Sequence, residues 1–184
     1  MDRKLEEKTI ASQEIFQGKI IKVRVDTVLL PDGGKATREV VEHPGAVAVI
    51  PVSDQNEVIM VRQFRQPTGE ILLELPAGKR DQEESPLVCA RRELEEETGY
   101  RAREWKTLFS FFTTPGFSNE LLSLVLARGL EKGEARPEGE EFLEVVAVPL
   151  DRARQMVLQG EIKDAKTIIG ILALSIPGEE KNAF

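Results

Sequence analysis

The stretch GKRDQEESPLVCARRELEEETGY, residues Gly78–Tyr100, is the most informative part of this chain. It combines residues that mark both ends of a helix with a cluster of glutamates. Ser85 can cap a helix, Pro86 suits its first position, and Gly99 suits the left-handed residue after its last turn. These signals predict a helix over Pro86–Thr98. One face of this helix should pack on a sheet. Its residues are spaced three or four apart: Leu87, Ala90, Leu94 and Thr98.

Four glutamates crowd the last two turns of this helix, at Glu93, Glu95, Glu96 and Glu97. The negative end of the helix dipole disfavours anions there, and all of them except Glu95 share roughly one 100° arc, where like charges repel. A bound cation would explain both violations, and three carboxylates on one face suit Mg²⁺ or Mn²⁺. Composition alone favours the simpler alternative, a solvated acidic surface.

The spacing around the helix matches the motif GX5EX7REUXEEXGU, in which U is a bulky apolar residue, at every fixed position. The matching residues are Gly78, Glu84, Arg92, Glu93, Leu94, Glu96, Glu97 and Gly99. Tyr100 stands where an aliphatic residue is preferred, a departure that concerns packing rather than catalysis. This motif is the Nudix box, so the chain resembles Nudix hydrolases, which cleave a diphosphate joined to a nucleoside and another group.

The resemblance implies an α/β fold, an α/β/α sandwich around a mixed sheet with an N-terminal antiparallel strand region. Residues 1–43 would form that strand region, exchanged between subunits, and residues 44–184 a single Nudix hydrolase domain. The residue pattern alone predicts strands at Ile20–Leu30, Lys35–Glu42, Gly45–Val52, Val58–Phe64, Ile71–Leu75, Glu104–Phe112, Leu121–Ala127 and Phe142–Val148. It predicts further helices at Asp151–Gln159 and Asp164–Leu174, and turns at Pro31–Gly34 and Ser53–Asn56.

Composition limits the class of protein. With 184 residues the chain has the size of one domain, and its net charge of −7 argues against binding to nucleic acid or to anionic membrane surfaces. The single cysteine, Cys89, cannot form an internal disulfide, and no apolar run is long enough to span a bilayer, so a cytoplasmic location is expected. The single histidine, His43, excludes a zinc site of the HExxH type. The chemistry must therefore rest on carboxylates.

The family pattern assigns roles to the acidic residues. Glu93, Glu96, Glu97 and the Ala77 carbonyl would hold divalent cations, Mg²⁺ or Mn²⁺, and Arg92 would orient the ligands through Glu84 or Glu96. A second acidic segment, the expected loop Gly133–Glu141, contains two further matches to the family pattern. Glu138 matches the position of the general base, and Glu140 matches that of a further metal ligand. The choice among Glu138, Glu140 and Glu141 stays open, and a solvated acidic turn is the alternative.

The subfamily is indicated outside the box. Pro115 lies 16 residues after Gly99, an offset similar to the signature of bacterial ADP-ribose pyrophosphatases, and the resemblance extends over about Lys8 to Leu174. Other matching segments are Arg38-Glu39, His43-Pro44-Gly45-Ala46, Val61–Arg65, Leu75–Gly78 and Asp164–Thr167. The implied substrate contacts are Arg38, Glu39, Arg65, Lys79, Thr114, Pro115, Gly116 and Glu120. The implied assembly is a homodimer with exchanged N-terminal strands.

The resemblance implies Mg²⁺-dependent hydrolysis of ADP-ribose to AMP and ribose 5-phosphate. Two alternatives stay open: hydrolysis of another nucleoside diphosphate sugar, or a non-catalytic module that binds ADP-ribose or a nucleotide. Cys89 lies at the same helical angle as the carboxylates, which would suppress its thiolate and argue against a nucleophilic role. His43 is expected to make a structural or substrate-side contact rather than to act as acid or base.

Overall fold

The computed structural model describes residues 3–81, 83–133 and 142–174. The chain divides into two compact units. The first consists of Met1–Gly45 with Phe112–Leu121, and the second of Ala46–Phe111 with Leu122–Phe184. Each unit is described by itself below.

The first unit is an antiparallel sheet in the order β1-β2-β3. Its strands are β1 (Lys8–Gln17), β2 (Lys22–Leu29) and β3 (Lys35–Glu42), preceded by the short 3₁₀ helix η1 (Arg3–Leu5). The predicted turn between β2 and β3 is confirmed, with the Leu30 amide donating to the Gly34 carbonyl at 2.7 Å. Segment Phe112–Leu121 joins this unit through β3, where the Val41 amide donates to the Phe117 carbonyl at 2.7 Å.

Strand β1 was not predicted, and its residues explain why. All ten of its residues are exposed, so it has no buried face to impose an alternating pattern of apolar and polar residues. Its position is defined by pairing with β2, from Lys8 opposite Leu29 to Gln17 opposite Lys22. Pairing between separate segments cannot be predicted from the composition of one segment alone.

The second unit contains two sheets. The mixed sheet has the order β7-β4-β9-β8, in which β4 runs parallel to β9 and antiparallel to β7. Its strands are β7 (Ala77–Lys79), β4 (Ala46–Pro51), β9 (Leu121–Lys132) and β8 (Tyr100–Phe112). The other sheet is antiparallel in the order β10-β5-β6, formed by β10 (Leu143–Pro149), β5 (Glu57–Arg65) and β6 (Glu70–Glu74).

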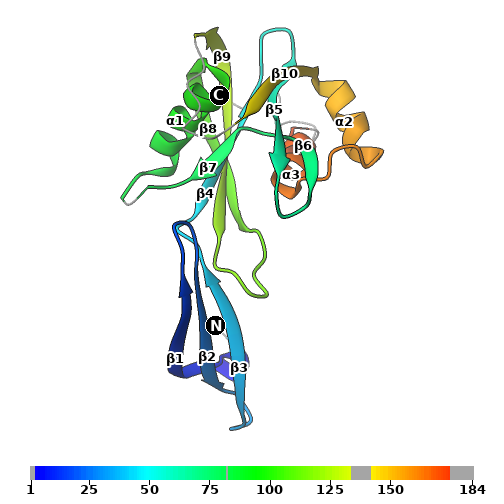
Figure 1. Ribbon diagram of the computed structural model, residues 1–184. Helices are drawn as coiled ribbons and strands as arrows, with labels where there is room; N and C mark the ends of the chain where they lie inside the picture. Colours follow the sequence, from blue (N-terminus) through cyan, green and yellow to red (C-terminus); the bar gives the residue numbers. More distant parts are fainter. Residues whose placement is uncertain (1–2, 82, 134–141, 175–184) are drawn as a thin grey trace. The chain divides into compact units, whose positions relative to one another are not determined.

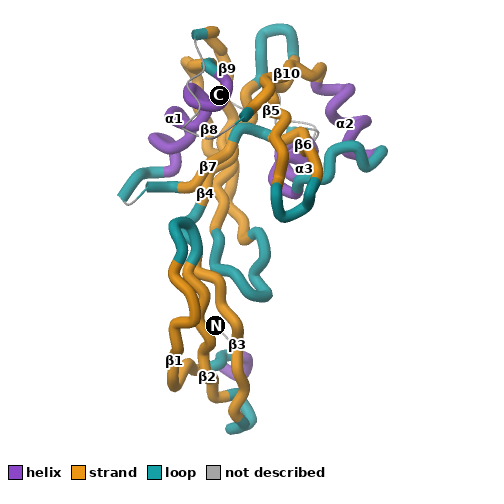
Figure 2. Tube along the Cα trace, viewed as in Figure 1, coloured by secondary structure: helices purple, strands orange, loops and turns teal. Residues whose placement is uncertain are grey.

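Three helices pack on these sheets: α1 (Pro86–Thr98), α2 (Leu150–Leu158) and α3 (Ala165–Ala173). Strand β4 is buried on both faces, as expected for a central strand with helices on each side. Val47 and Val49 pack in a cluster with Leu94 of α1, whereas Ala48 and Ile50 of the opposite face join a larger core that contains residues of α2 and α3. Within this unit α1 therefore lies on one side of the mixed sheet and α2 and α3 on the other (Figures 1 and 2). The predicted α/β/α sandwich is confirmed.

Most predicted elements match the structure, including both ends of α1. The three-residue strand β7 was missed, because a segment this short with a central glycine carries no strand signal. No helix in the described part of the chain is both long and apolar enough to cross a membrane.

Candidate active site

Helix α1 begins and ends at the residues that its sequence predicts. The Ser85 hydroxyl accepts a hydrogen bond from the Val88 amide at 3.4 Å, and Pro86 occupies the first turn. At the other end Gly99 adopts a left-handed conformation with φ of 73°, and its amide donates to the Glu95 carbonyl at 2.9 Å. Both ends are thus fixed locally, which sets the direction in which each glutamate of the last two turns points.

The acidic face of α1 is turned inward. Glu93 is 8% exposed and Glu97 is 5% exposed, so the alternative of a solvated acidic surface is wrong for these two residues. Glu95 points elsewhere, as predicted, and pairs with Arg101 on the surface at 2.5 Å. Buried carboxylates need a compensating positive charge or hydrogen-bond donors.

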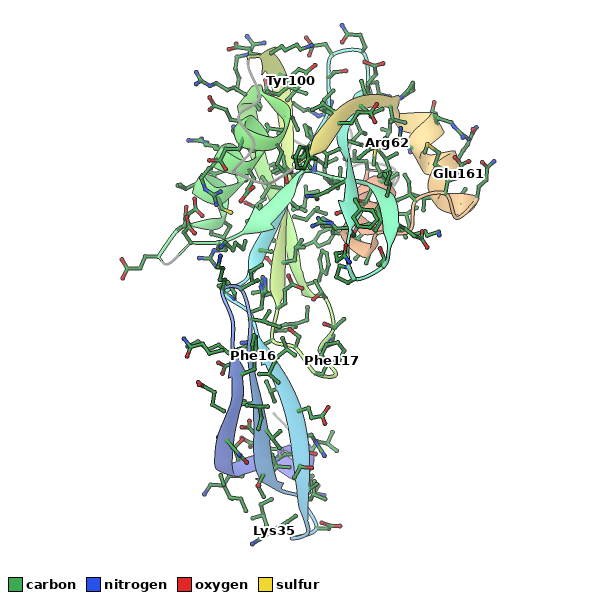
Figure 3. All side chains as sticks on the ribbon, in the orientation of Figure 1. Phe16, Lys35, Arg62, Tyr100, Phe117 and Glu161 are labelled. Carbon is green, nitrogen blue, oxygen red and sulfur yellow. The ribbon has the colours of Figure 1, made fainter. Side chains whose placement is uncertain are left out.

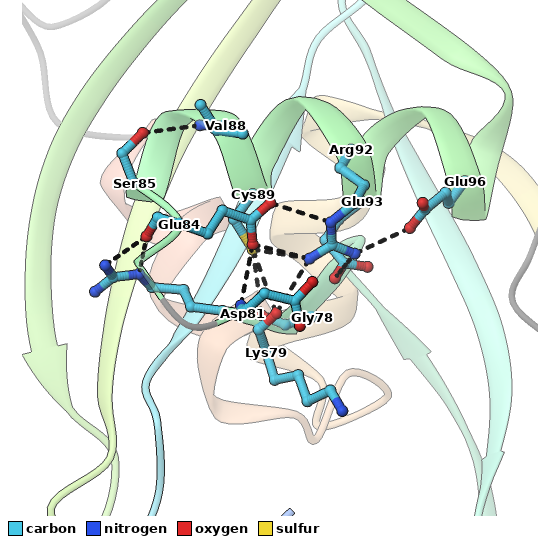
Figure 4. Close-up of polar contacts among 11 residues, drawn as sticks. Gly78, Lys79, Asp81, Glu84, Ser85, Val88, Cys89, Arg92, Glu93 and Glu96 are labelled. Carbon is cyan, nitrogen blue, oxygen red and sulfur yellow. Dashed lines mark hydrogen bonds and ion pairs between the residues drawn. The ribbon is translucent and has the colours of Figure 1, made fainter.

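Arg92 supplies much of that compensation (Figure 4). Its Nη1 atom donates to Glu93 at 2.8 Å and to Glu96 at 3.0 Å, while Nε and Nη2 each donate to Glu84 at 3.1 Å. Nη2 also donates to the Lys79 carbonyl at 3.2 Å. The predicted contacts to both Glu84 and Glu96 are therefore present, and one guanidinium links three carboxylates of the motif to the loop before the helix.

The charges in this network stabilise one another. The hydrogen bond from Arg92 is the largest cause that lowers the pKa of Glu84 below its ordinary value. The same hydrogen bond, followed by the charge of Glu93 and bonds to Glu96, raises the pKa of Arg92. Glu84 and Arg92 are therefore both charged at neutral pH and stabilise each other as an ion pair.

The loop before α1 wraps the carboxylates closely. A Cβ atom at Gly78 would overlap the Glu93 carboxylate, so only glycine leaves room for that side chain. The Ala77 amide donates to Glu97 Oε2 at 3.0 Å. The backbone thus binds Glu97 at Ala77, just before the motif, and lies against Glu93 at Gly78, the first residue of the motif.

The donor chemistry fits a hard divalent cation. Glu93, Glu96 and Glu97 supply carboxylate oxygens within two turns of one helix, and such oxygens are the ligands that Mg²⁺ prefers. Among residues 3–81, 83–133 and 142–174, no three acidic, histidine or cysteine side chains already converge as a cation site. Arg92 instead bridges two of these carboxylates. Glu138, Glu140 and Glu141 lie outside the described residues.

Two of the implied substrate contacts also belong to the second unit. Lys79 has an exposed side chain next to the motif glycine. Arg65, at the end of β5, donates through Nε and Nη2 to Glu74, each at 2.8 Å. Glu74 was not predicted as a site residue. Its place as the one charged residue of the predicted strand Ile71–Leu75 was a signal that could have indicated a role.

The other implied contacts lie in the first unit. Arg38 is bound to Glu7 through Nε at 3.0 Å, and Glu39 is exposed. Thr114 accepts backbone hydrogen bonds from Phe117 and Ser118 across a tight turn that contains Pro115 and Gly116. At the end of that turn, Glu120 accepts a hydrogen bond from the Thr113 hydroxyl at 2.6 Å.

His43 makes structural contacts within the first unit. Its Nδ1 atom accepts a hydrogen bond from the Gly45 amide at 3.1 Å and lies 3.5 Å from Glu120. Its own amide donates to the Asn119 side chain at 2.8 Å. These contacts join the strand end to the turn, which fits the structural one of the two contacts expected for His43.

Cys89 is buried beneath the loop that precedes α1. Its sulfur lies 3.5 Å from the Lys79 carbonyl, and Arg92 Nη2 lies 3.5 Å from it. Burial, followed by the charges of Glu84 and Glu93, raises its pKa to about 12. The thiolate is therefore suppressed at neutral pH, and Cys89 has a packing role.

Comparison with known proteins agrees with this geometry. Residues 42–169 match the model of the NUDIX domain, and residues 7–41 match that of the nucleoside diphosphate sugar hydrolase N-terminal domain. The chain is 46% identical to an ADP-ribose pyrophosphatase of Bacillus subtilis, with 95% of both chains covered. It is 44% identical to a methanol dehydrogenase activator of Bacillus methanolicus, with 96% of both covered.

A solved structure, that of an ADP compounds hydrolase, shares the fold with a TM-score of 0.82 at 20% sequence identity. It covers 93% of this chain, and 94% of its own chain is matched. The complete motif, the packing of its helix on the mixed sheet and the match over residues 42–169 agree with one another. The chain belongs to the NUDIX domain family.

Proposed function

We propose that this protein hydrolyses the diphosphate of ADP-ribose to AMP and ribose 5-phosphate, using a divalent cation, with Mg²⁺ as the expected ion. The observation that carries the proposal is the inward-facing acidic side of α1, where Arg92 joins Glu84, Glu93 and Glu96 against the Gly78 loop. The choice of ADP-ribose is supported by the name of the relative that is 46% identical over 95% of the chain.

Each part of the proposed site has a distinct task. A divalent cation, when bound, would neutralise phosphate oxygens and lower the pKa of a water molecule. Glu93, Glu96, Glu97 and the Ala77 carbonyl would hold it, and Arg92 would keep the carboxylates oriented. Glu138 would take a proton from the attacking water as its oxygen bonds to one phosphorus and the bond from that phosphorus to the bridging oxygen breaks.

The proposal predicts that the purified protein converts ADP-ribose to AMP rapidly with Mg²⁺ and stops when EDTA is added. The measurement is AMP release, followed in parallel with ADP-glucose, GDP-mannose, NADH and a nucleoside triphosphate. A preference for another nucleotide sugar would keep the chemistry and replace the substrate. Binding of ADP-ribose without turnover of any compound would contradict hydrolysis and favour a binding module.

We also propose that the protein is a homodimer in which N-terminal strands are exchanged, so that each subunit's Arg38 reaches the substrate held by the other. Strand β1 supports this assembly, because a strand exposed along its whole length is unusual in an isolated chain. Apolar side chains on this sheet are also exposed, Ile15 to 55% and Phe16 to 54%. Phe16 is labelled in Figure 3. A second copy would cover them.

Mixing two inactive variants tests the exchange. Arg38→Ala and Glu97→Gln should each have low activity, whereas a mixture refolded together should recover about a quarter of the wild-type rate, because half of the dimers are mixed and each contains one intact site. Light scattering on the same samples gives the oligomeric state. A monomer, or a dimer whose mixture recovers nothing, would contradict the exchange without affecting the proposed reaction.

A further inference from the structure

Five polar residues, of which Glu74 and Thr167 are buried, form a cluster beside the candidate site, and none of the roles above explains it. We call it the Glu74 cluster; its members are Arg65 at the end of β5, Glu74 at the end of β6, and Asp164, Lys166 and Thr167 at the start of α3. Asp164, Lys166 and Thr167 belong to the segment Asp164–Thr167, which matches the ADP-ribose pyrophosphatase pattern but was assigned no role in the sequence analysis. Their contacts supply one.

Glu74 is the centre of the cluster. It is 1% exposed and accepts two parallel hydrogen bonds from Arg65, from Nε to Oε1 and from Nη2 to Oε2, both at 2.8 Å. Lys166 also pairs with Oε2 of Glu74 and lies 3.0 Å from Asp164 Oδ1. Two carboxylates thus face two cations, and the two-pronged bond holds the plane of the Arg65 guanidinium in one orientation.

Glu74 is ionised in this setting. Burial alone raises its pKa, but the hydrogen bond from Arg65 and the charge of Lys166 outweigh burial and hold the pKa below its ordinary value. The pKa of Arg65 is raised, first by the hydrogen bond to Glu74 and further by the charges of Glu97 and Asp164. Arg65 is therefore electrostatically coupled to Glu97, one of the carboxylates of the candidate site.

The cluster also fixes the backbone that follows Glu74. The Leu75 amide donates to the Thr167 hydroxyl at 2.8 Å, and that hydroxyl donates to Asp164 Oδ2 at 2.6 Å. Asp164 in turn caps α3 by accepting from the Thr167 amide at 3.0 Å. The chain enters the motif loop two residues after Leu75, at Ala77, so α3 holds both the Arg65 partner and the approach to that loop.

Arg65 keeps an accessible edge. Its side chain is 40% exposed although its partner is buried, and Nη1 takes no part in the two bonds to Glu74. An arginine bound on one edge and open on the other can present donors to a phosphate without first losing side-chain freedom.

From this geometry we infer that Glu74 is a positioning residue, which acts through Arg65 by holding its guanidinium toward the substrate diphosphate, with Lys166 and Thr167 anchoring the arrangement to α3. This inference rests on the proposed function, since it takes Arg65 as a contact of the diphosphate. It adds a residue that touches neither substrate nor cation.

A double-mutant cycle tests whether Glu74 acts through Arg65. Glu74→Gln keeps the shape of the side chain but loses the charge, and we expect kcat/KM to fall roughly 10- to 100-fold, as for a reacting group that is slightly misplaced. Arg65→Ala should lower it at least as much. The double variant should be no slower than Arg65→Ala alone, because the two residues form one unit. Losses that multiply in the double variant would overturn the inference.

Control variants separate positioning from stability. Val148→Ala, in the buried core on β10, should lower the melting temperature while kcat and KM remain those of wild type. Lys166→Arg keeps the charge beside Glu74 and should retain most activity, whereas Lys166→Met should lose part of it. If Glu74→Gln lowers only the melting temperature and leaves the kinetics unchanged, the residue is structural and the inference is wrong.

A binding measurement distinguishes failure of this inference from failure of the proposed reaction. Calorimetric titration with ADP-ribose in EDTA needs no turnover, and Glu74→Gln and Arg65→Ala should weaken binding by similar factors. Equal affinity of wild type and both variants would overturn the role of Glu74, even in an active enzyme. Parallel weakening in a protein that hydrolyses nothing in the substrate panel would support it while the hydrolase proposal fails.

Discussion

The Glu97→Gln variant is expected to lose most of its turnover and to remain folded. Glu97 is 5% exposed at the base of the acidic face, and a glutamine oxygen can still accept the bond from the Ala77 amide. The substitution removes one negative charge one turn from Glu93, so repulsion in the free protein falls. Loss of one charged ligand should lower kcat by roughly 10²- to 10³-fold, the size seen when one electrostatic contact to a transition state is removed.

Steady-state rates at saturating Mg²⁺ and ADP-ribose measure this effect, with thermal unfolding as the test of folding. Glu95→Gln is the matched control, because it lies on the same helix and removes the same charge but pairs with Arg101 on the surface. That control should keep the wild-type rate. A Glu97→Gln enzyme that also keeps it would show that Glu97 holds no cation.

Local signals made α1 predictable. Its cap at Ser85, its Pro86 and its terminal Gly99 all act within a few residues of the helix ends, so both ends could be placed from the sequence. The inward direction of the acidic face could not be derived from composition, which favours a solvated surface. The resemblance to Nudix hydrolases assigned these glutamates to a cation site without giving their direction, and the structure shows that Glu93 and Glu97 are buried.

Contacts between distant segments were not predictable. Glu74 binds Lys166 from α3, and the Leu75 amide binds Thr167, across 92 residues in each case. Nothing near Glu74 in the sequence indicates such a partner, beyond the oddity of an acid in an apolar strand. Strand β1 could not be predicted for a similar reason: it is defined by its pairing with β2, and neither of its faces is buried.

The motif glycine is the second position where a small change should have a large effect. Gly78 is not among the glycines with positive φ, so a left-handed turn is not the reason that the motif has a glycine here. Its reason is space: a Cβ atom there would overlap the Glu93 carboxylate, whose atoms are the three nearest to it. Because the obstacle is the far end of a flexible side chain, Gly78→Ala should fold, with Glu93 displaced from its bond to Arg92.

We therefore expect Gly78→Ala to lower kcat by roughly 10²-fold, as when a reacting group is displaced by about 1 Å, and to raise the Mg²⁺ concentration needed for half-maximal rate. Rates over a Mg²⁺ series and the far-ultraviolet circular dichroism spectrum measure both predictions. The background variant Glu93→Ala provides the control, since without that carboxylate an added Gly78→Ala change should cost little more. If Gly78→Ala lowers kcat by the same factor in the Glu93→Ala background, the glycine is needed for the conformation of the loop itself. If Gly78→Ala alone leaves kcat unchanged, Glu93 functions without lying against the Gly78 backbone.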